Sequence, residues 1–345
     1  MAWAAQMAGC PASFIIDFSA SINPLGPPQS AIAAIQQGLA ALTAYPDPDY
    51  SQLRSALAQW HQLPPEWILP GNGSAELLTW ASWELSQLNL TYLIVPAFGD
   101  YWRALNTFGA KIQACLLPCE SGDWDSNLKS QIQNPNLSGL LLNNPHNPTG
   151  KLFSLDSLLP YLDKLALVVV DEAFMDFLLP ENQQSLLSVV QDYPNLVILR
   201  SLTKFYSLPG LRLGYAIAHP DRLKRWQRWR DPWPVNILAA MAGEAAIQDR
   251  AFQVQTWDWL LPTRDKLYQG LSALPGLHPL QGAANFLLVR SENSSLQWQE
   301  KLLVRDRLLI RDCLSFPELG DRYFRVAVRS QEDNQRLLEG LAKFR

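Results

Sequence analysis

The stretch SLTKFYSLPGLRLGY at residues 201–215 places two cations in an otherwise apolar segment. Lys204 follows the apolar run NLVILRSLT, and Arg212 follows a Pro-Gly break. A lysine amine in apolar surroundings has a lowered pKa and becomes a nucleophile that can form a Schiff base with a carbonyl compound. Because most lysines are solvated surface groups, this interpretation of Lys204 depends on the rest of the chain.

Short apolar runs alternate with longer helical stretches along most of the sequence. The runs are TYLIVP (91–96), GLLLNNP (139–145), LALVVVDE (165–172), NLVILRSLTK (195–204) and RLGYAIA (212–218). Strands of a parallel sheet have this near-continuous apolar character, because helices cover both faces of the sheet. The sequence therefore predicts an α/β protein with a mostly parallel central sheet, and a ligand site beyond the carboxyl ends of the strands.

The last hundred residues follow a different pattern. A long helix is expected to begin in WPVNILAAMAGEAAIQD, and strand-like segments follow at 285–291, 308–313 and 323–330. This order predicts a smaller α+β domain. We expect a large domain at residues 40–235, and a small domain made of residues 1–39 and 236–345.

Composition limits the class of protein. The 345 residues are 48% hydrophobic and 17% charged, which is typical of a globular chain, and the net charge of −4 favours neither nucleic acid nor an anionic membrane as a partner. No apolar run approaches the roughly 18 residues that span a bilayer, and the N-terminus lacks the basic segment of a signal peptide, so a cytoplasmic location is expected. The four cysteines and four histidines are scattered, so neither a metal site nor structural disulfides are expected.

Polar residues at two other strand ends complement Lys204. Asp171 ends the run LALVVVD, where a carboxylate is costly unless it has a partner such as a protonated pyridine nitrogen; the alternative is an aspartate that caps a turn. Asn147 lies in NNPHNPTG, which is typical of a turn, although its amide could also donate to a phenolate oxygen. Together with Lys204, these residues suggest a site for an aromatic carbonyl cofactor.

A glycine-rich turn provides an anion site. The segment GNGSAEL at residues 71–77 precedes a predicted helix, whose first N–H groups are free to bind a phosphate. The donors expected around that phosphate are Ser74, Ala75, Ser201 and Arg212.

Taken together, NPHNPTG, VVVDEAF and SLTKFYSLPGLRLGY resemble the fold-type I pyridoxal-phosphate (PLP) enzymes of the aminotransferase class I/II group, over nearly the whole chain. The resemblance implies the fold-type I transferase fold and the cofactor pyridoxal 5'-phosphate. It implies that Lys204 forms the Schiff base, that Asp171 pairs with the pyridine nitrogen and that Asn147 bonds the phenolate oxygen. Ser74, Ala75, Ser201 and Arg212 would bind the cofactor phosphate.

The same resemblance suggests roles for residues outside these motifs. Phe98, in PAFGDY, is placed like the aromatic residue that stacks on the cofactor ring. Tyr45, in AYPDPDY, resembles the tyrosine that reaches the neighbouring subunit's phosphate, which implies a homodimer with shared active sites. Arg325, in YFRVAVR, resembles the arginine that binds the substrate carboxylate, for which a planar guanidinium is suited. Candidates for substrate-phosphate binding are Ser21, Asn23 and Arg311.

Two subfamilies share most of this pattern, the L-threonine-O-3-phosphate decarboxylases and the histidinol-phosphate aminotransferases. Three features resemble the decarboxylases more closely: DFSASINPLGPP at residues 17–28, Phe174 where aminotransferases usually carry a tyrosine, and the details of the 201–215 stretch. The decarboxylases usually have a His-Gly-Gly segment just before their equivalent of AWAAQ, whereas this sequence has Met1 there, and a longer natural N-terminus would explain the difference.

The resemblance thus predicts decarboxylation of L-threonine O-3-phosphate to (R)-1-amino-2-propanol O-2-phosphate and CO2, in cobalamin biosynthesis. The alternative is transamination of histidinol phosphate with 2-oxoglutarate, in which the Cα–H bond breaks and Lys204 moves the proton. An alternative of another class is a non-catalytic binding protein that uses the basic run DRLKRWQRWRD at residues 221–231.

Overall fold

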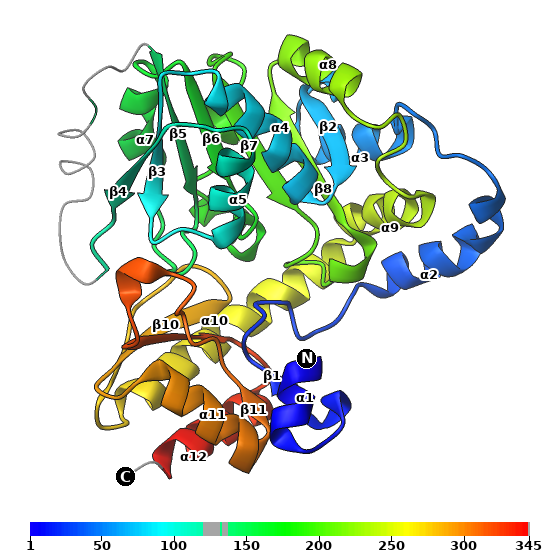
Figure 1. The fold of residues 1–345 in the computed structure, drawn as a ribbon. Coiled ribbons are helices and arrows are strands. Elements are labelled where there is room, and N and C mark those ends of the chain that lie inside the picture. Colours follow the sequence, from blue (N-terminus) through cyan, green and yellow to red (C-terminus); the bar gives the residue numbers. More distant parts are fainter. Residues whose placement is uncertain (120–131, 133–136, 344–345) are drawn as a thin grey trace.

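The computed structural model describes residues 1–119, 132 and 137–343. A seven-stranded sheet forms the centre of its larger part (Figure 1). In spatial order the strands are β2 (Ile68–Asn72), β8 (Leu213–Ala218), β7 (Leu196–Ser201), β6 (Leu167–Asp171), β5 (Ser138–Asn143), β3 (Leu90–Val95) and β4 (Ile112–Leu116). The strands from β7 to β4 pair in parallel, whereas β8 is antiparallel to both β7 and β2. This is the predicted mostly parallel α/β sheet.

Helices cover both faces of this sheet. Side chains of α4 (Ser74–Ser86), α5 (Gly99–Thr107) and α8 (Pro220–Trp229) pack with Val169 and Leu199 on one face. Side chains of α3 (Ser51–His61), α7 (Leu155–Leu162) and α9 (Ile237–Gln248) pack with Val170 and Ile198 on the other. Because strand residues alternate between the faces, each inner strand is apolar throughout and is buried on both sides.

The smaller part contains two further sheets. The first is antiparallel and has the order β12 (Tyr323–Ala327), β10 (Phe286–Ser291), β9 (Leu277–Pro279). The second pairs β1 (Ile16–Asp17) in parallel with β11 (Leu308–Leu309), so the two ends of the chain meet there. The helices of this part are α1 (Ala2–Ala8), α10 (Arg250–Ser272), α11 (Ser295–Asp306) and α12 (Gln331–Ala342), and both termini lie in it (Figure 1).

The domain boundaries expected at residues 39/40 and 235/236 remain a proposal. Helix α2 (Gln29–Gly38) lies against α9, and a side chain at Gly243 of α9 would collide with Leu213 of β8. Since α9 packs on the central sheet and α2 packs on α9, we propose that both helices belong to the large domain. In the part of the chain that the structure describes, no helix is both long and apolar enough to cross a bilayer.

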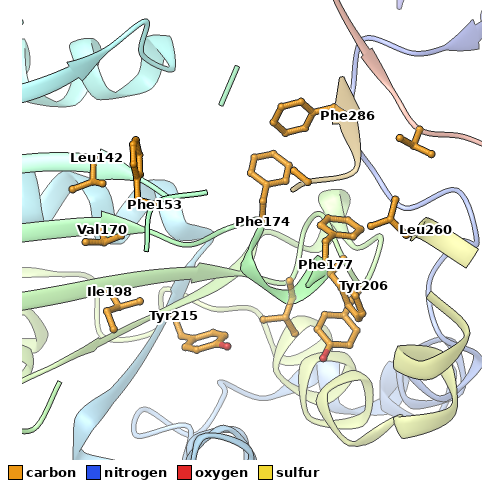
Figure 2. Close-up of a cluster of buried hydrophobic side chains, with 14 of the residues drawn as sticks. Leu142, Phe153, Val170, Phe174, Phe177, Ile198, Tyr206, Tyr215, Leu260 and Phe286 are labelled. Carbon is orange, nitrogen blue, oxygen red and sulfur yellow. The ribbon is translucent and has the colours of Figure 1, made fainter. Parts of the chain in front are cut away.

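One apolar core joins the two parts. Figure 2 shows Phe174, just beyond β6, directed toward Phe286 of β10, while Phe177 lies near Tyr206 and Leu260. The rings of Phe174 and Phe286 meet edge to face, with centroids 5.1 Å apart. The small antiparallel sheet is therefore packed directly against the carboxyl end of the large one, where the polar motifs lie.

Candidate active site

A cavity of about 350 Å³ opens at the carboxyl ends of β5, β6 and β7. Its volume lies in the range of small-molecule sites, and its position is the one that parallel α/β sheets favour for a ligand. The structure brings together in its lining Ser74, Ala75, Phe98, Asn147, Asp171, Ser201, Lys204, Arg212, Arg311 and Arg325. The motifs that were predicted from separate parts of the sequence therefore meet in one place.

Lys204 lies in the loop after β7, between the buried residues Leu202 and Phe205. Its Nζ lies 6.0 Å from the centroid of the Phe174 ring. Burial lowers the pKa of Lys204 to about 8, the guanidinium groups of Arg325 and Arg212 add to this, and Asp171 opposes it. Roughly a tenth of the side chain is therefore a neutral amine at pH 7, far more than for an ordinary lysine, and the neutral amine is the form that attacks a carbonyl carbon.

Asp171 ends β6, and its carboxylate faces the cavity. The Tyr101 hydroxyl donates to Oδ2 at 2.8 Å, and the Ala173 N–H donates to Oδ1 at 3.0 Å. Burial raises the pKa of Asp171, whereas these two hydrogen bonds and Lys204 lower it. A buried carboxylate in this position is suited to pair with a protonated ring nitrogen.

The N-terminus of α4 forms an anion cradle. The helix begins at Ser74, and no side chain caps it. Gly73 has φ +72°, and a Cβ there would lie 2.5 Å from Nη2 of Arg212, so the guanidinium approaches the helix start only because Gly73 has no side chain. Free N–H groups, the helix dipole and a guanidinium together suit a phosphate group.

Asn147 is held by a residue of the smaller part. Nη1 of Arg325 donates to Oδ1 of Asn147, and Nη2 donates to the carbonyl oxygen of Ser19 at 3.0 Å. Because Oδ1 is engaged, the Asn147 amide has its Nδ2 donor left for a ligand in the cavity. Arg325 also lies over the ring of Phe286, 5.0 Å from its centroid, and its burial lowers its pKa to about 10.

Pyridoxal phosphate would need an amine for its carbonyl carbon, a donor for its phenolate, a carboxylate for its ring nitrogen and a cradle for its phosphate. Lys204, Asn147 and Asp171 supply the first three groups in one cavity, and the start of α4 with Arg212 supplies the cradle. The residues present therefore fit this cofactor.

Arg311 and Ser21 form part of the same lining. Arg311 pairs with Arg325 through an isolated backbone bridge, and its Nη2 donates to Ser315 Oγ at 2.7 Å. The Ser21 hydroxyl is buried and has no hydrogen-bond partner within the described chain. Both side chains therefore have hydrogen-bonding capacity left for a ligand.

Two predicted site residues lie outside the cavity lining. Asn23 is buried, but its Nδ2 donates to Phe205 O and Thr256 Oγ1, both at 2.9 Å, and its Oδ1 accepts from Leu25 N. With these bonds made, its side chain is not available to bind substrate in this arrangement. Its own N–H donates to the carbonyl oxygen of Lys204, so Asn23 supports the lysine loop instead.

Tyr45 is 77% exposed and stacks on Trp233, with ring centroids 4.4 Å apart. It does not line the cavity of its own chain.

Tyr101 was not among the predicted site residues. It belongs to α5, which begins just after Phe98, and its hydroxyl is the side-chain donor to Asp171. Its place just after a predicted strand puts it near the ligand end of the sheet, but a sequence alone cannot show which carboxylate the tyrosine meets.

Comparisons with known proteins agree with this architecture and site. The model of the family described as aminotransferase class I and II matches residues 14–341. Threonine-phosphate decarboxylase of Salmonella typhimurium is 40% identical over 344 residues, which cover 98% of this chain and 93% of that protein. Histidinol-phosphate aminotransferase of Symbiobacterium thermophilum is 34% identical over 331 residues, which cover 95% and 90%.

Solved structures show the same fold. The histidinol-phosphate aminotransferase from Clostridium acetobutylicum superposes with a TM-score of 0.88 at 27% identity, covering 95% of this chain and 98% of that one. The L-threonine-O-3-phosphate decarboxylase from Porphyromonas gingivalis, at 23% identity, gives a TM-score of 0.85 over 96% of this chain and 99% of that one. The chain therefore belongs to the aminotransferase class I and II family of pyridoxal 5'-phosphate-dependent enzymes, which act on small amino-acid substrates.

Proposed function

We propose that this enzyme is a carboxy-lyase that converts L-threonine O-3-phosphate into (R)-1-amino-2-propanol O-2-phosphate and CO2, as a step of cobalamin biosynthesis. The relative named threonine-phosphate decarboxylase, 40% identical over almost the whole chain, supports this choice. The absence of a phenol at Phe174, where the aminotransferases usually carry a tyrosine, also supports it.

The observation that carries the proposal is a pair of guanidinium groups on the small-domain side of the cavity. Arg311 and Arg325 both line it, and neither makes a salt bridge within the described residues. Buried or partly enclosed cations normally have an anionic partner. A substrate that carries both a carboxylate and a phosphate would supply two anions to this side, while Arg212 would hold the cofactor's phosphate.

The residue roles follow from the geometry of the cavity. Bound pyridoxal phosphate supplies an electron-withdrawing ring that accepts the electron pair left at the substrate's Cα when a bond to Cα breaks. We assign Lys204 to the carbonyl carbon, Asp171 to the ring nitrogen, Asn147 to the phenolate oxygen, and Ser74, Ala75, Ser201 and Arg212 to the phosphate. Phe98 would cover one face of the ring.

In the proposed reaction, Arg325 binds the carboxylate and Arg311 the phosphate of the substrate. The Cα–carboxylate bond breaks, CO2 leaves, and one proton is added to Cα. Lys204, whose side chain lines the cavity, is the group to which we assign the holding and return of that proton. Asp171, supported by Tyr101, stabilises positive charge on the ring nitrogen throughout.

Transamination of histidinol phosphate is the second candidate. It is favoured by the 34% identity to the Symbiobacterium thermophilum enzyme of that name, and the same Lys204 could move a proton from Cα instead. The two reactions differ in which bond at Cα breaks, so their products separate them.

The test uses purified protein loaded with pyridoxal phosphate and given L-threonine O-3-phosphate. We expect CO2 release, no need for 2-oxoglutarate, and loss of release in Lys204→Ala. Glutamate-forming activity with histidinol phosphate or another amino donor, without CO2, would contradict the proposal while leaving the cofactor assignment in place.

We also propose that the enzyme is a homodimer with shared active sites. The exposed, stacked pair Tyr45 and Trp233 supports this, because the two adjoining rings form a contiguous apolar surface of the kind found at protein–protein interfaces. Sedimentation equilibrium should give twice the chain mass for the native protein. A monomer that binds the cofactor with full activity would contradict it.

A further inference from the structure

Behind the cavity, three charged side chains form a buried cluster. Arg200 donates from Nη2 to Glu172 Oε2 at 2.8 Å and from Nη1 to Asp176 Oδ1 at 2.6 Å. The Arg200 side chain is 1% exposed, and that of Glu172 is fully buried. Burying three charges costs free energy, and a buried ion pair is often no more stabilising than apolar packing. We therefore expect this cluster to have a role other than stability.

Each end of the cluster is next to a residue of the cavity lining. Glu172 directly follows Asp171 at the end of β6, and Arg200 directly precedes Ser201 at the end of β7. Successive strand residues face opposite sides of a sheet. Asp171 and Ser201 share a face with Val169 and Leu199, while Glu172 and Arg200 share the other with Val170 and Ile198.

The ion pair between Glu172 and Arg200 thus joins the ends of β6 and β7 on the face opposite the cavity. Asp171 and Ser201, the neighbouring residues, face the cavity at the same point. The backbone adds to this link between the strands, since Glu172 N donates to Leu199 O at 2.8 Å. Lys204 follows Ser201 by three residues, and the Thr203 N–H donates to Ser201 Oγ. A shift of β7 against β6 would therefore move Ser201 and Lys204 relative to Asp171.

The cluster also holds the adjoining loops. Ser185 donates from Oγ to Glu172 Oε2 at 2.7 Å and accepts from Arg200 at 3.1 Å. Asp176 lies in the turn that follows Phe174, the ring beneath Lys204, and its carbonyl oxygen accepts from Trp257 Nε1 of α10 at 2.8 Å. The guanidinium of Arg200 therefore links the ends of β6 and β7 to the turn that follows Phe174. Through the carbonyl oxygen of Asp176, that turn is also bound to α10 of the smaller part.

We propose that Arg200, Glu172 and Asp176 form a positioning network that sets the spacing of Asp171, Ser201 and Lys204 for the cofactor. A planar guanidinium is suited to the task, because its two ends fix two carboxylates at defined angles, which apolar packing does not do. The inference rests on the family's cofactor and not on the choice of substrate, so it stands or fails apart from the proposed reaction.

The first test is Glu172→Gln, which keeps the shape of the side chain but weakens its bond to Arg200. Glu84→Gln is the matched control, because Glu84 pairs with Arg222 at 2.8 Å and with Arg225, away from the cavity. The readouts are the Kd of the cofactor-free protein for pyridoxal phosphate by absorbance titration, and the pH midpoint of the bound cofactor's absorbance.

We expect Glu172→Gln to raise the Kd about tenfold or more, as loss of an outer partner does at metal sites, and to shift the pH midpoint. Glu84→Gln should change neither. Wild-type Kd and midpoint in Glu172→Gln would overturn the proposal.

A triple variant separates positioning from folding. Arg200→Met, Glu172→Leu and Asp176→Leu together remove every charge of the cluster, a kind of change that often leaves stability unaltered. A folded triple variant with a raised Kd and a shifted midpoint would support the network, and one that binds the cofactor as the wild type does would show that the cluster only stabilises the fold. Arg200→Lys, which keeps the charge but not the fork, should be intermediate.

Discussion

The groups around Lys204 lower its pKa on balance. Burial and the two guanidinium groups of Arg325 and Arg212 outweigh Asp171, and together they hold its pKa at about 8. Only the neutral amine reacts with a carbonyl carbon, so the reaction of cofactor-free protein with pyridoxal phosphate should depend on pH.

We expect the rate of that reaction to rise about tenfold per pH unit below pH 8 and to level off above it. Stopped-flow absorbance across the pH range measures this, with Lys204→Ala as the unreactive control. A midpoint near the ordinary lysine value would mean that the ammonium is not desolvated as the structure indicates.

Tyr101→Phe tests the support of Asp171. The change removes a hydrogen bond to a buried carboxylate, a type of bond that contributes about 1.5–3 kcal/mol, so the Kd for the cofactor should rise by about tenfold or more. Tyr193→Phe is the control, because it removes a tyrosine–aspartate bond of 3.1 Å at the surface. Equal effects of the two changes on the Kd would argue against a role of Tyr101 at the site.

At the scale of elements, the start of α4 depends on the absence of a side chain at Gly73. Gly73→Ala would force a residue with φ +72° to carry a Cβ against Arg212, so we expect weaker cofactor binding and about 1 kcal/mol or more of lost stability. Gly99→Ala, at the start of α5, is the control, because its Cβ would meet nothing within 4 Å. Thermal unfolding with and without cofactor measures both effects. An unchanged Kd in Gly73→Ala would contradict the anion cradle.

The sequence predicted the inner strands well, and the reason is physical. Strands β6, β7 and β8 lie within the apolar runs, and β3 and β5 each begin one residue before theirs, because burial on both faces favours apolar residues along most of each strand. Strand β2 was missed, since Pro70 and Gly71 are typical of a turn, yet a proline is tolerated at the edge of a sheet. Strand β4 was missed because it forms the other edge of the sheet and only one of its five residues, Cys115, is fully buried.

The site was predictable where it follows from motifs at strand ends. The parallel sheet brings Asp171, Asn147 and Ser201 to one edge, and the glycine turn at α4 adds the cradle. Contacts between distant elements were not predictable, since spacing does not show which side chains meet. Examples are the bond from Tyr101 to Asp171, the bond from Arg325 to Asn147, and the internal partners of Asn23.

At the scale of the whole molecule, the cavity is closed by two packed domains. The small domain contributes Arg311 and Arg325, and the large one contributes the groups that fit the cofactor. We therefore propose that the large sheet supplies most of the groups that bind the cofactor, and that the substrate binds where the two domains meet.

Arg325→Lys should raise the KM for substrate at least tenfold, because an ammonium cannot replace a two-pronged guanidinium contact. Steady-state kinetics of CO2 release measures the change. Arg322→Lys, a surface arginine beside Asp321, is the control and should behave as the wild type. An unchanged KM in Arg325→Lys would remove Arg325 from the substrate site.

The central claim is that the bond broken at Cα is the one to the carboxylate. The most direct measurement is the mass spectrum of the product formed from L-threonine O-3-phosphate in D2O. We predict an amino-alcohol phosphate that has lost the carboxyl group, keeps the original α-hydrogen and carries one new carbon-bound deuterium. A product or recovered substrate in which the carboxyl group is present and the α-hydrogen is lost would show that the enzyme breaks the Cα–H bond, and would contradict the decarboxylase account.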